Sequence, residues 1–107
     1  MKTLTWQKPG QQNVAQELIK IIINYVAELR SYMKSEIELY IIRKVKERRI
    51  QINISQRYLA DCLNVSQSFI QQIEDENTSI AYNIDHLNAV AKILKCSMKD
   101  FIPDAPI

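Results

Sequence analysis

The most regular pattern of apolar and polar positions lies in the first third of the chain. Apolar residues recur there at spacings of four and three, which is typical of one face of an α-helix. They are Leu18, Ile22, Tyr25, Leu29 and Tyr32. Those that widen the stripe are Ile19, Ile23, Val26 and Met33. Because this stripe is wider than the seam of a two-stranded coiled coil, we expect a helix over residues 14–33 that is buried against its own domain or another chain. The polar residues 3–12 predict an arm, in which Trp6 anchors the helix by packing.

A second helix is predicted to start at Ser35, because Glu38 follows three residues later and completes a capping box. Ser31 is an alternative start, and with that start the first two helices run together. The residues expected to share one face of this helix are Ile37, Tyr40, Ile41, Val45 and Arg48. Residues 50–54 alternate apolar and polar side chains, as in a strand. We interpret them as a helix end and a loop, because the chain offers no partner strand.

Two short helices joined by a tight turn are predicted next. Ser55 is expected to cap a helix over residues 56–63, and Ser66 to cap another over residues 67–75. Asn64 lies between them and tolerates the left-handed conformation that such a turn needs. The apolar residues expected to face inward are Leu59, Ala60, Leu63, Val65, Ile70 and Ile73.

The last third of the chain predicts a helix and a final turn. Asn83 is expected to cap a helix over residues 84–94, after a polar loop. Ser97 is expected to cap a turn over residues 98–102, which Pro103 ends. The inward face of this helix is expected to be Leu87, Val90, Ala91 and Leu94. Together these elements predict a domain over residues 35–107, preceded by an arm and an amphipathic helix over residues 1–34.

Composition agrees with an all-α fold and narrows the function. One Gly and three Pro leave few helix breakers, and 47% apolar residues suffice for a core. No secretory signal is visible, and the apolar stretch is too polar for a membrane span, so we expect a cytoplasmic protein with no membrane contact. Cys62, Cys96 and the single His86 cannot complete a four-ligand zinc site. We therefore expect two reduced, mostly buried thiols and no metal or cofactor.

Catalytic motifs are not recognisable in the sequence. It has no Ser/His/Asp set, no Gly-rich phosphate loop and no paired-carboxylate motif, so we expect no catalytic residues and no enzyme activity.

Charge is unevenly divided between the two halves of the chain. Residues 1–53 carry ten basic residues against five glutamates, a net +5, whereas residues 54–107 carry four against seven acidic residues, a net −3. A basic face, which DNA binders usually have, is therefore expected only in the first half.

The paired helices leave a polar, almost uncharged face for recognition. Its residues are Gln67, Ser68, Gln71 and Gln72. A Gln amide can bond adenine N6 and N7 together, and a Ser hydroxyl can bond several bases. Here the sequence resembles the Cro/C1-type, lambda-repressor-like helix-turn-helix domains of the XRE family, over roughly residues 41–102. The resemblance rests on Ser55-Gln56, Leu59-Ala60, Asn64-Val65-Ser66, Gln67-Ser68, Ile70, Ile73-Glu74 and the segments 83–87, 91–94 and 97–103. It implies a five-helix DNA-binding domain, here with an extra N-terminal helix.

The resemblance also implies roles for individual residues. Gln67, Ser68 and Gln72, with Gln71 beside them, fall where such domains read bases in the major groove of double-stranded DNA. Gln56 falls where the family contacts a phosphate and braces the recognition helix, and the Ser66 hydroxyl and helix N-terminus can meet another phosphate. Arg49 and Glu74 match an internal salt bridge of the family.

The loop after the recognition helix departs from the family pattern. Where the family often has Asn-Gly and a basic residue, this chain has Asp75-Glu76-Asn77-Thr78, and carboxylates near phosphates cost affinity. Neutral donors available to phosphates are Asn77, Thr78, Ser79 and Tyr82. Positive charge is expected from Arg57 and from Arg43 in the basic stretch 43–46, although the rest of that stretch is equally typical of a solvated helix face.

Three functions remain open at this point. The first is a transcriptional regulator that binds operator DNA as a homodimer, with residues 14–33 as dimerisation helix or as an additional cap on the domain's own core. The second is an antitoxin, whose added apolar helix covers a toxin protein. The third is a protein-interaction module that has lost DNA binding, which the net −3 of residues 54–107 favours. His86 is expected at the surface, and Phe69 is expected to pack on the following loop or to touch a thymine methyl group.

Overall fold

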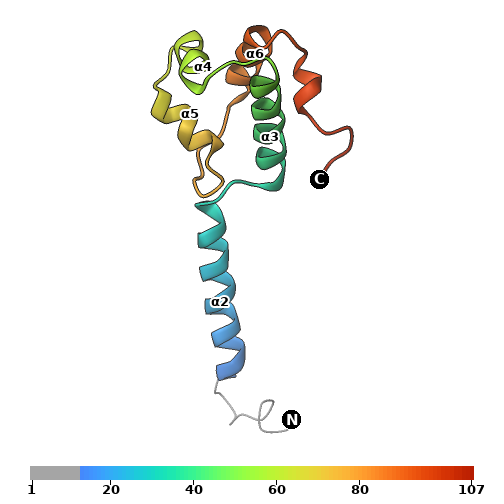
Figure 1. Ribbon diagram of the computed structural model, residues 1–107. Helices are drawn as coiled ribbons and strands as arrows, with labels where there is room; N and C mark the ends of the chain where they lie inside the picture. The colour runs from blue at the N-terminus through green and yellow to red at the C-terminus, as the bar shows by residue number, and fades with distance from the viewer. Residues whose placement is uncertain (1–12) are drawn as a thin grey trace. The chain divides into compact units, whose positions relative to one another are not determined.

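The computed structural model describes residues 13–107, and these residues form helices and connecting turns without a strand (Figure 1). The helices are α2 (Val14–Ser31), α3 (Glu36–Gln51), α4 (Gln56–Leu63), α5 (Gln67–Glu74), α6 (Ile84–Ile93) and the 3-10 helix η1 (Met98–Phe101). The predicted all-α fold is therefore confirmed. The predicted arm and the packing of Trp6 lie outside the described residues. No helix within 13–107 has the length and apolarity to cross a membrane.

The chain divides into two units, one ending at Ser31 and the other running from Tyr32 to Ile107. In the first unit, α2 starts where the Asn13 side chain accepts a hydrogen bond from the backbone N–H of Ala15 at 3.0 Å. Because α2 is the only helix among the described residues of this unit (13–31), its apolar stripe is exposed there. Leu18, for example, leaves 54% of its surface exposed.

Helices α2 and α3 are separate, which decides between the two predicted starts. Ser35 accepts from the backbone N–H of Glu38 at 3.3 Å, and its own N–H donates to the Glu38 carboxylate at 2.8 Å. This capping box begins α3 as predicted, whereas Ser31 is the last residue of α2. Residues 50–54 form the end of α3 and a loop, also as predicted. In that loop Asn53 adopts a positive φ of 59°.

The core of the second unit lies between α3, α4, α5, α6 and η1, each of which contacts at least one other of them, and Figure 1 shows these helices grouped together. Its buried apolar residues are Ile42, Val45, Leu59, Ala60, Ile70, Ile73, Leu87, Val90, Ala91, Leu94 and Phe101. The predicted inward residues of α4, α5 and α6 are among them, although Leu63 and Val65 are only partly buried. The polar faces of these helices remain in solvent, so the domain is an ordinary one-core helical unit.

The apolar face predicted for α3 overlaps the face that the helix buries only in part, since Val45 is buried and Ile41 packs against the core. The buried residues of α3 are Ile42, Val45 and Arg49, whereas Ile37 is 40% exposed. The reason is that the helix turns a charged residue, Arg49, toward the interior, where an acidic partner neutralises it. Arg48, predicted to share the apolar face, donates from its guanidinium to the carbonyls of Leu94 and Lys95 at the end of α6. An apolar pattern cannot predict either position.

The cysteines also differ from expectation. Both are free thiols, but Cys62 is exposed and Cys96 is only partly buried. The prediction of two mostly buried thiols is therefore wrong for Cys62, because α4 buries the face of Leu59 and Ala60 and turns Cys62 away from it. Burial raises the pKa of the Cys96 thiol, which the nearby Arg48 guanidinium partly offsets.

Candidate nucleic-acid interface

The two short helices α4 and α5 begin at serine caps and meet through an asparagine turn. Ser55 accepts from the backbone N–H of Tyr58 at 3.0 Å, and Ser66 accepts from that of Phe69 at 3.1 Å. Between the helices Asn64 has φ 58° and ψ 44°, the left-handed conformation that its type tolerates. All three predictions are confirmed, and they define a helix-turn-helix.

The outer face of α5 gathers the polar residues that the sequence singled out. Ile70 and Ile73 are fully buried on the inner face. At about 100° per residue, positions 68, 71 and 72 lie on the opposite side of this helix and position 67 lies at its flank. The corresponding side chains, Gln67, Ser68, Gln71 and Gln72, are all exposed. The structure thus brings together four neutral side chains that can donate and accept hydrogen bonds; their contact with bases stays a prediction.

A buried ion pair holds the end of α5 against α3. The Arg49 guanidinium donates to both carboxylate oxygens of Glu74, at 2.9 Å from Nε and 2.7 Å from Nη2. The side chains are only 10% and 3% exposed. Nη1 of Arg49 donates to the carbonyl of Ile54 at 2.8 Å, which also fastens the loop before α4. The implied internal salt bridge is therefore present, and it occupies the Arg49 guanidinium.

Gln56, at the start of α4, joins the same cluster. Its side-chain amide donates to Oε1 of Glu74 at 3.0 Å. This bond braces the recognition helix, as the resemblance implied for Gln56. Its contact with a phosphate stays a prediction, since the bond to Glu74 uses only one of two amide protons.

A second attachment of α5 comes from a residue that the sequence analysis did not consider. Lys34, just before the cap of α3, is only 7% exposed. Its ammonium donates to the carbonyls of Gln72 at 3.2 Å, Asp75 at 2.5 Å and Thr78 at 2.7 Å. It also donates to the Thr78 hydroxyl at 2.9 Å. No local signal could have revealed this role, because the acceptors lie 38 to 44 positions away.

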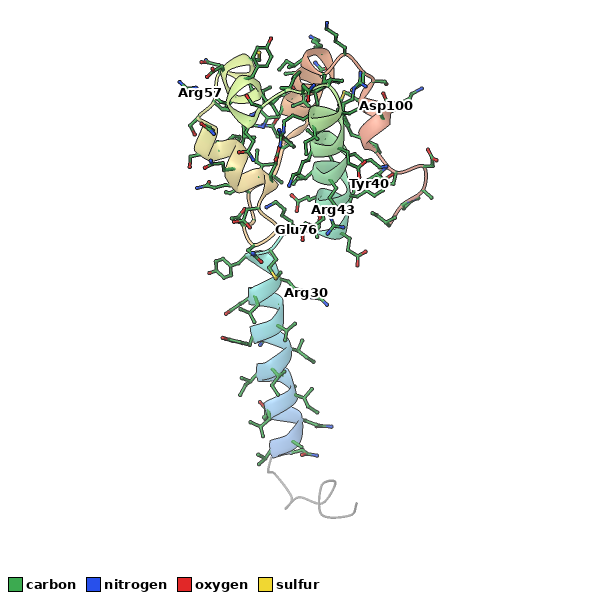
Figure 2. All side chains as sticks on the ribbon, viewed as in Figure 1. Arg30, Tyr40, Arg43, Arg57, Glu76 and Asp100 are labelled. Atoms are coloured by element: carbon green, nitrogen blue, oxygen red, sulfur yellow. The ribbon has the colours of Figure 1, made fainter. Side chains whose placement is uncertain are left out.

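The acidic loop after α5 meets a basic side chain from α3. The Arg43 guanidinium donates to Oε1 of Glu76 at 3.0 Å from Nε and 2.7 Å from Nη2, and Figure 2 shows the two side chains next to each other. Both remain more than half exposed. Because an exposed pair of this kind is worth little to stability, its main effect is to neutralise a carboxylate near the outer face of α5. The predicted phosphate contact of Arg43 therefore has a competitor within the chain.

The neutral donors proposed for phosphates divide into available and unavailable groups. The Thr78 hydroxyl donates to the carbonyl of Gln72, so its single proton is used. The Tyr82 hydroxyl is buried and lacks a hydrogen-bond partner among the described residues. The prediction that these two hydroxyls donate to phosphates is therefore wrong, because each hydroxyl is turned toward the protein. Asn77 and Ser79 are exposed, and so is Arg57 on α4, which Figure 2 labels.

Burial also governs the chemistry of Tyr82 and its neighbours. Burial raises the pKa of the Tyr82 phenol, and the Glu74 carboxylate acts in the same direction. His86 packs edge-on against Phe69, with ring centroids 5.5 Å apart, and also against Tyr82. Its Nδ1 accepts from the backbone N–H of Asn83 at 3.3 Å, so His86 completes the capping box of which Asn83 is the N-cap, and it is half-buried rather than fully at the surface. Phe69 therefore packs against His86 and is only partly buried.

Within residues 13–107, no three His, Cys, Asp or Glu side chains converge on a possible metal position. No curated protein matches the sequence. The family model HTH_3, described as helix-turn-helix, matches residues 45–101, more than half of the chain. This range contains α4, the Asn64 turn and α5, and domains of this family are DNA-binding regulatory domains. The chain therefore belongs to the Cro/C1-type helix-turn-helix family, also called XRE.

Proposed function

We propose that this protein is a sequence-specific transcriptional regulator that binds operator DNA as a homodimer, with α5 in the major groove. The observation that carries the proposal is the outer face of α5. It presents four exposed neutral side chains, while the inner face and the C-terminal end of the helix are fixed by Ile70, Ile73 and the Arg49–Glu74 pair. A rigid helix with hydrogen-bonding side chains of this kind suits the reading of base edges.

Attraction to phosphates comes from a few groups around this face. Arg57 is exposed near the start of α4, and the N-terminus of α5 presents backbone N–H groups beside the Ser66 hydroxyl. Asn77 and Gln56 supply neutral donors. The carboxylates of Asp75 and Glu76 oppose this attraction, but the Arg43 guanidinium donates to the Glu76 carboxylate, and the charge of Lys34, whose ammonium binds the Asp75 carbonyl, acts on both carboxylates. The positive charge that one domain offers to DNA is therefore modest, and the second domain of the homodimer supplies the additional affinity.

The apolar stripe of α2 supports a second copy of this chain as the partner. Ala15, Leu18, Ile22, Tyr25 and Leu29 follow spacings of three and four, the pattern of a helix that packs along another helix. Ile22 and Leu29 expose 59% and 48% of their surface, which is costly unless another surface covers them.

The charges beside the stripe favour a parallel pair. Glu28 and Arg30 precede and follow Leu29, so each lies about 100° from it, on either side of the line formed by Ala15, Leu18, Ile22, Tyr25 and Leu29. In a parallel pair the acidic edge of one helix faces the basic edge of the other, whereas an antiparallel pair brings like edges together. A parallel pair also carries both domains at the same end, as two half-sites of an operator require.

The homodimer is tested by light scattering on the full chain. We expect the wild-type protein to have twice the mass of one chain. The variant Ile22→Gln with Leu29→Gln should have the mass of one chain, because buried amides in the seam lack partners. The matched control carries Lys20→Gln with Asn24→Ala on the polar face and should stay dimeric. A wild-type mass of one chain at micromolar concentration would remove the homodimer from the proposal.

DNA binding is tested first with a random-sequence duplex at low salt, where the electrostatic attraction is strongest. We expect a mobility shift that weakens steeply as salt rises. Selection of genomic fragments then identifies the operator, and the selected fragment should bind at least about 1,000-fold more tightly than random DNA. If no shift appears even at low salt, the DNA-binding proposal fails and the interaction module remains.

The exposed stripe of α2 also supports a second candidate, an antitoxin that autoregulates its operon. In that case the apolar helix is covered by a toxin protein rather than by another copy of this chain. Coexpression with the product of a small neighbouring gene distinguishes the two. Copurification of that product in a stable complex that Ile22→Gln with Leu29→Gln disrupts, while the Lys20→Gln with Asn24→Ala control preserves it, favours the antitoxin.

A further inference from the structure

We propose that Lys34 is a positioning residue for DNA recognition, which holds the C-terminal end of α5 and the loop behind it in the conformation that reads bases. The inference rests on the proposed function and adds a residue outside the helix-turn-helix motif to it. Lys34 lies in the short connection between α2 and α3, eleven positions before the matched family range begins. It acts on base recognition through the end of α5 and the loop behind it.

The recognition helix lacks the usual means of ending. Helices commonly end on Gly or Asn in the left-handed conformation, or carry a basic residue in the last turn. In α5 the C-cap is Asp75 in an extended conformation, with φ −83° and ψ 117°, and the last turn has no basic residue. Its last carbonyls therefore need donors from elsewhere.

Lys34 supplies a donor to one of these carbonyls, that of Gln72, together with a positive charge. Its three ammonium protons meet four oxygen atoms, of which one belongs to the last turn of α5 and three to the loop behind it. The Thr78 hydroxyl closes the arrangement by donating to the same Gln72 carbonyl. The helix end, the loop and the start of α3 are thereby joined at a single nitrogen atom.

The bond from Lys34 to Gln72 matters for recognition because Gln72 takes part both in this attachment and in the outer face of α5. Its carbonyl accepts from Lys34, and its side chain belongs to the outer face of α5. A change in the backbone at residue 72 therefore moves a predicted base contact directly. Burial lowers the pKa of the Lys34 ammonium, while the carboxylates of Asp75, Glu38 and Glu76 act in the opposite direction. Those carboxylates and the helix end provide the negative surroundings that favour a cation here.

The contacts of Lys34 determine which fragment of the chain keeps the end of α5 attached. A fragment that begins at Ser35 lacks Lys34, although it keeps every residue of α3 to η1. The division of the chain after Ser31 keeps the attachment with the domain. The full chain is therefore the material for the experiment.

The test compares Lys34→Met with Lys92→Met, which removes an equal charge from the exposed face of α6. Each full-length variant is titrated with the fragment selected by the wild-type protein and with a random duplex. We expect Lys34→Met to lose about tenfold or more in affinity for the selected fragment, as for a mismatched base contact. Its affinity for random DNA should change no more than that of Lys92→Met. An unchanged ratio of selected to random affinity in folded Lys34→Met overturns the inference.

A milder variant covers the case in which Lys34→Met does not fold. Thr78→Val removes one acceptor of Lys34 and the donor to Gln72 while it leaves the ammonium in place. We expect it to lose several-fold in affinity for the selected fragment, without a matching loss for random DNA. Equal losses for both duplexes, or no loss, overturn the inference. Failure of the wild-type protein to bind either duplex is a separate result, which removes the proposed function instead.

Discussion

The guanidinium of Arg49 binds both carboxylate oxygens of Glu74, and this pair joins α3 to the last residue of the recognition helix. The Gln56 amide donates to the same carboxylate, so α4 is fastened at the same point. Three helices thus meet at one ion pair that is almost completely shielded from water. Because the remaining hydrogen-bonding capacity of the pair is largely satisfied, its geometry is well defined.

Breaking this pair from one side should be strongly destabilising. Arg49→Met and Glu74→Met each leave a buried charge without its partner, and we expect the free energy of unfolding to fall by about 3–5 kcal/mol. The double variant removes both charges, so its loss should be much smaller than the sum of the two. Urea denaturation of all four proteins gives the double-mutant cycle. Additive losses would mean that the two side chains do not act as a pair.

Removing single amides from the outer face of α5 should reduce specificity and leave folding intact. Gln67→Ala and Gln72→Ala are each expected to cost about 1–3 kcal/mol of discrimination on the selected operator. Affinity for random DNA should hardly change, since base contacts contribute little there. Fluorescence anisotropy with both duplexes measures the difference. Asn88→Ala on α6 is the control, and a loss of equal size there would contradict the assignment of α5.

Arg57 should act through charge alone. We expect Arg57→Gln to weaken binding to selected and random duplexes by a similar factor. The slope of log affinity against log salt should fall in magnitude by about one for each phosphate that the variant chain no longer neutralises. Titrations at four salt concentrations measure this slope. If the slope is unchanged, Arg57 does not contact a phosphate.

Tyr82 should tolerate the removal of its hydroxyl. That hydroxyl is buried without a hydrogen-bond partner among the described residues, so we expect Tyr82→Phe to raise the free energy of unfolding by about 1 kcal/mol. The raised pKa of the phenol predicts a pH dependence as well. Below the ordinary pKa of 10.0 the phenol is neutral in both the folded and unfolded states, and the difference between the two proteins is constant.

Above that pH the unfolded wild-type chain loses the Tyr82 proton while the folded chain retains it. The wild type should therefore lose stability relative to Tyr82→Phe as pH rises above 10.0. Urea denaturation at about pH 7 and about pH 11, on either side of that value, measures both effects. A Tyr82→Phe variant that is less stable at neutral pH would show that the hydroxyl has a bonding partner in solution.

Much of the interface was predictable because it depends on local chemistry. The caps Ser55 and Ser66, the left-handed Asn64 and the alternation of Ile70 and Ile73 with exposed amides are all set by residues within one or two turns of each other. Burial of Arg49 was predictable only through the family resemblance. The apolar period of α3 included the buried Val45 but not Arg49, since it gives no weight to a charge that has a buried partner.

The sequence by itself determined which segments are helical, where every described helix except α3 begins, and which side chains α5 exposes, because caps, turns and amphipathic spacing act over a few residues. Tertiary structure alone decided how the recognition helix is held. Lys34 and Arg43 reach the end of α5 and the loop behind it from 33 to 44 positions away. Hydrogen bonds to backbone carbonyls depend on where the chain passes in space and not on the identity of the residue that carries the carbonyl. For that reason the pattern of side chains carries no signal for the attachment at Lys34.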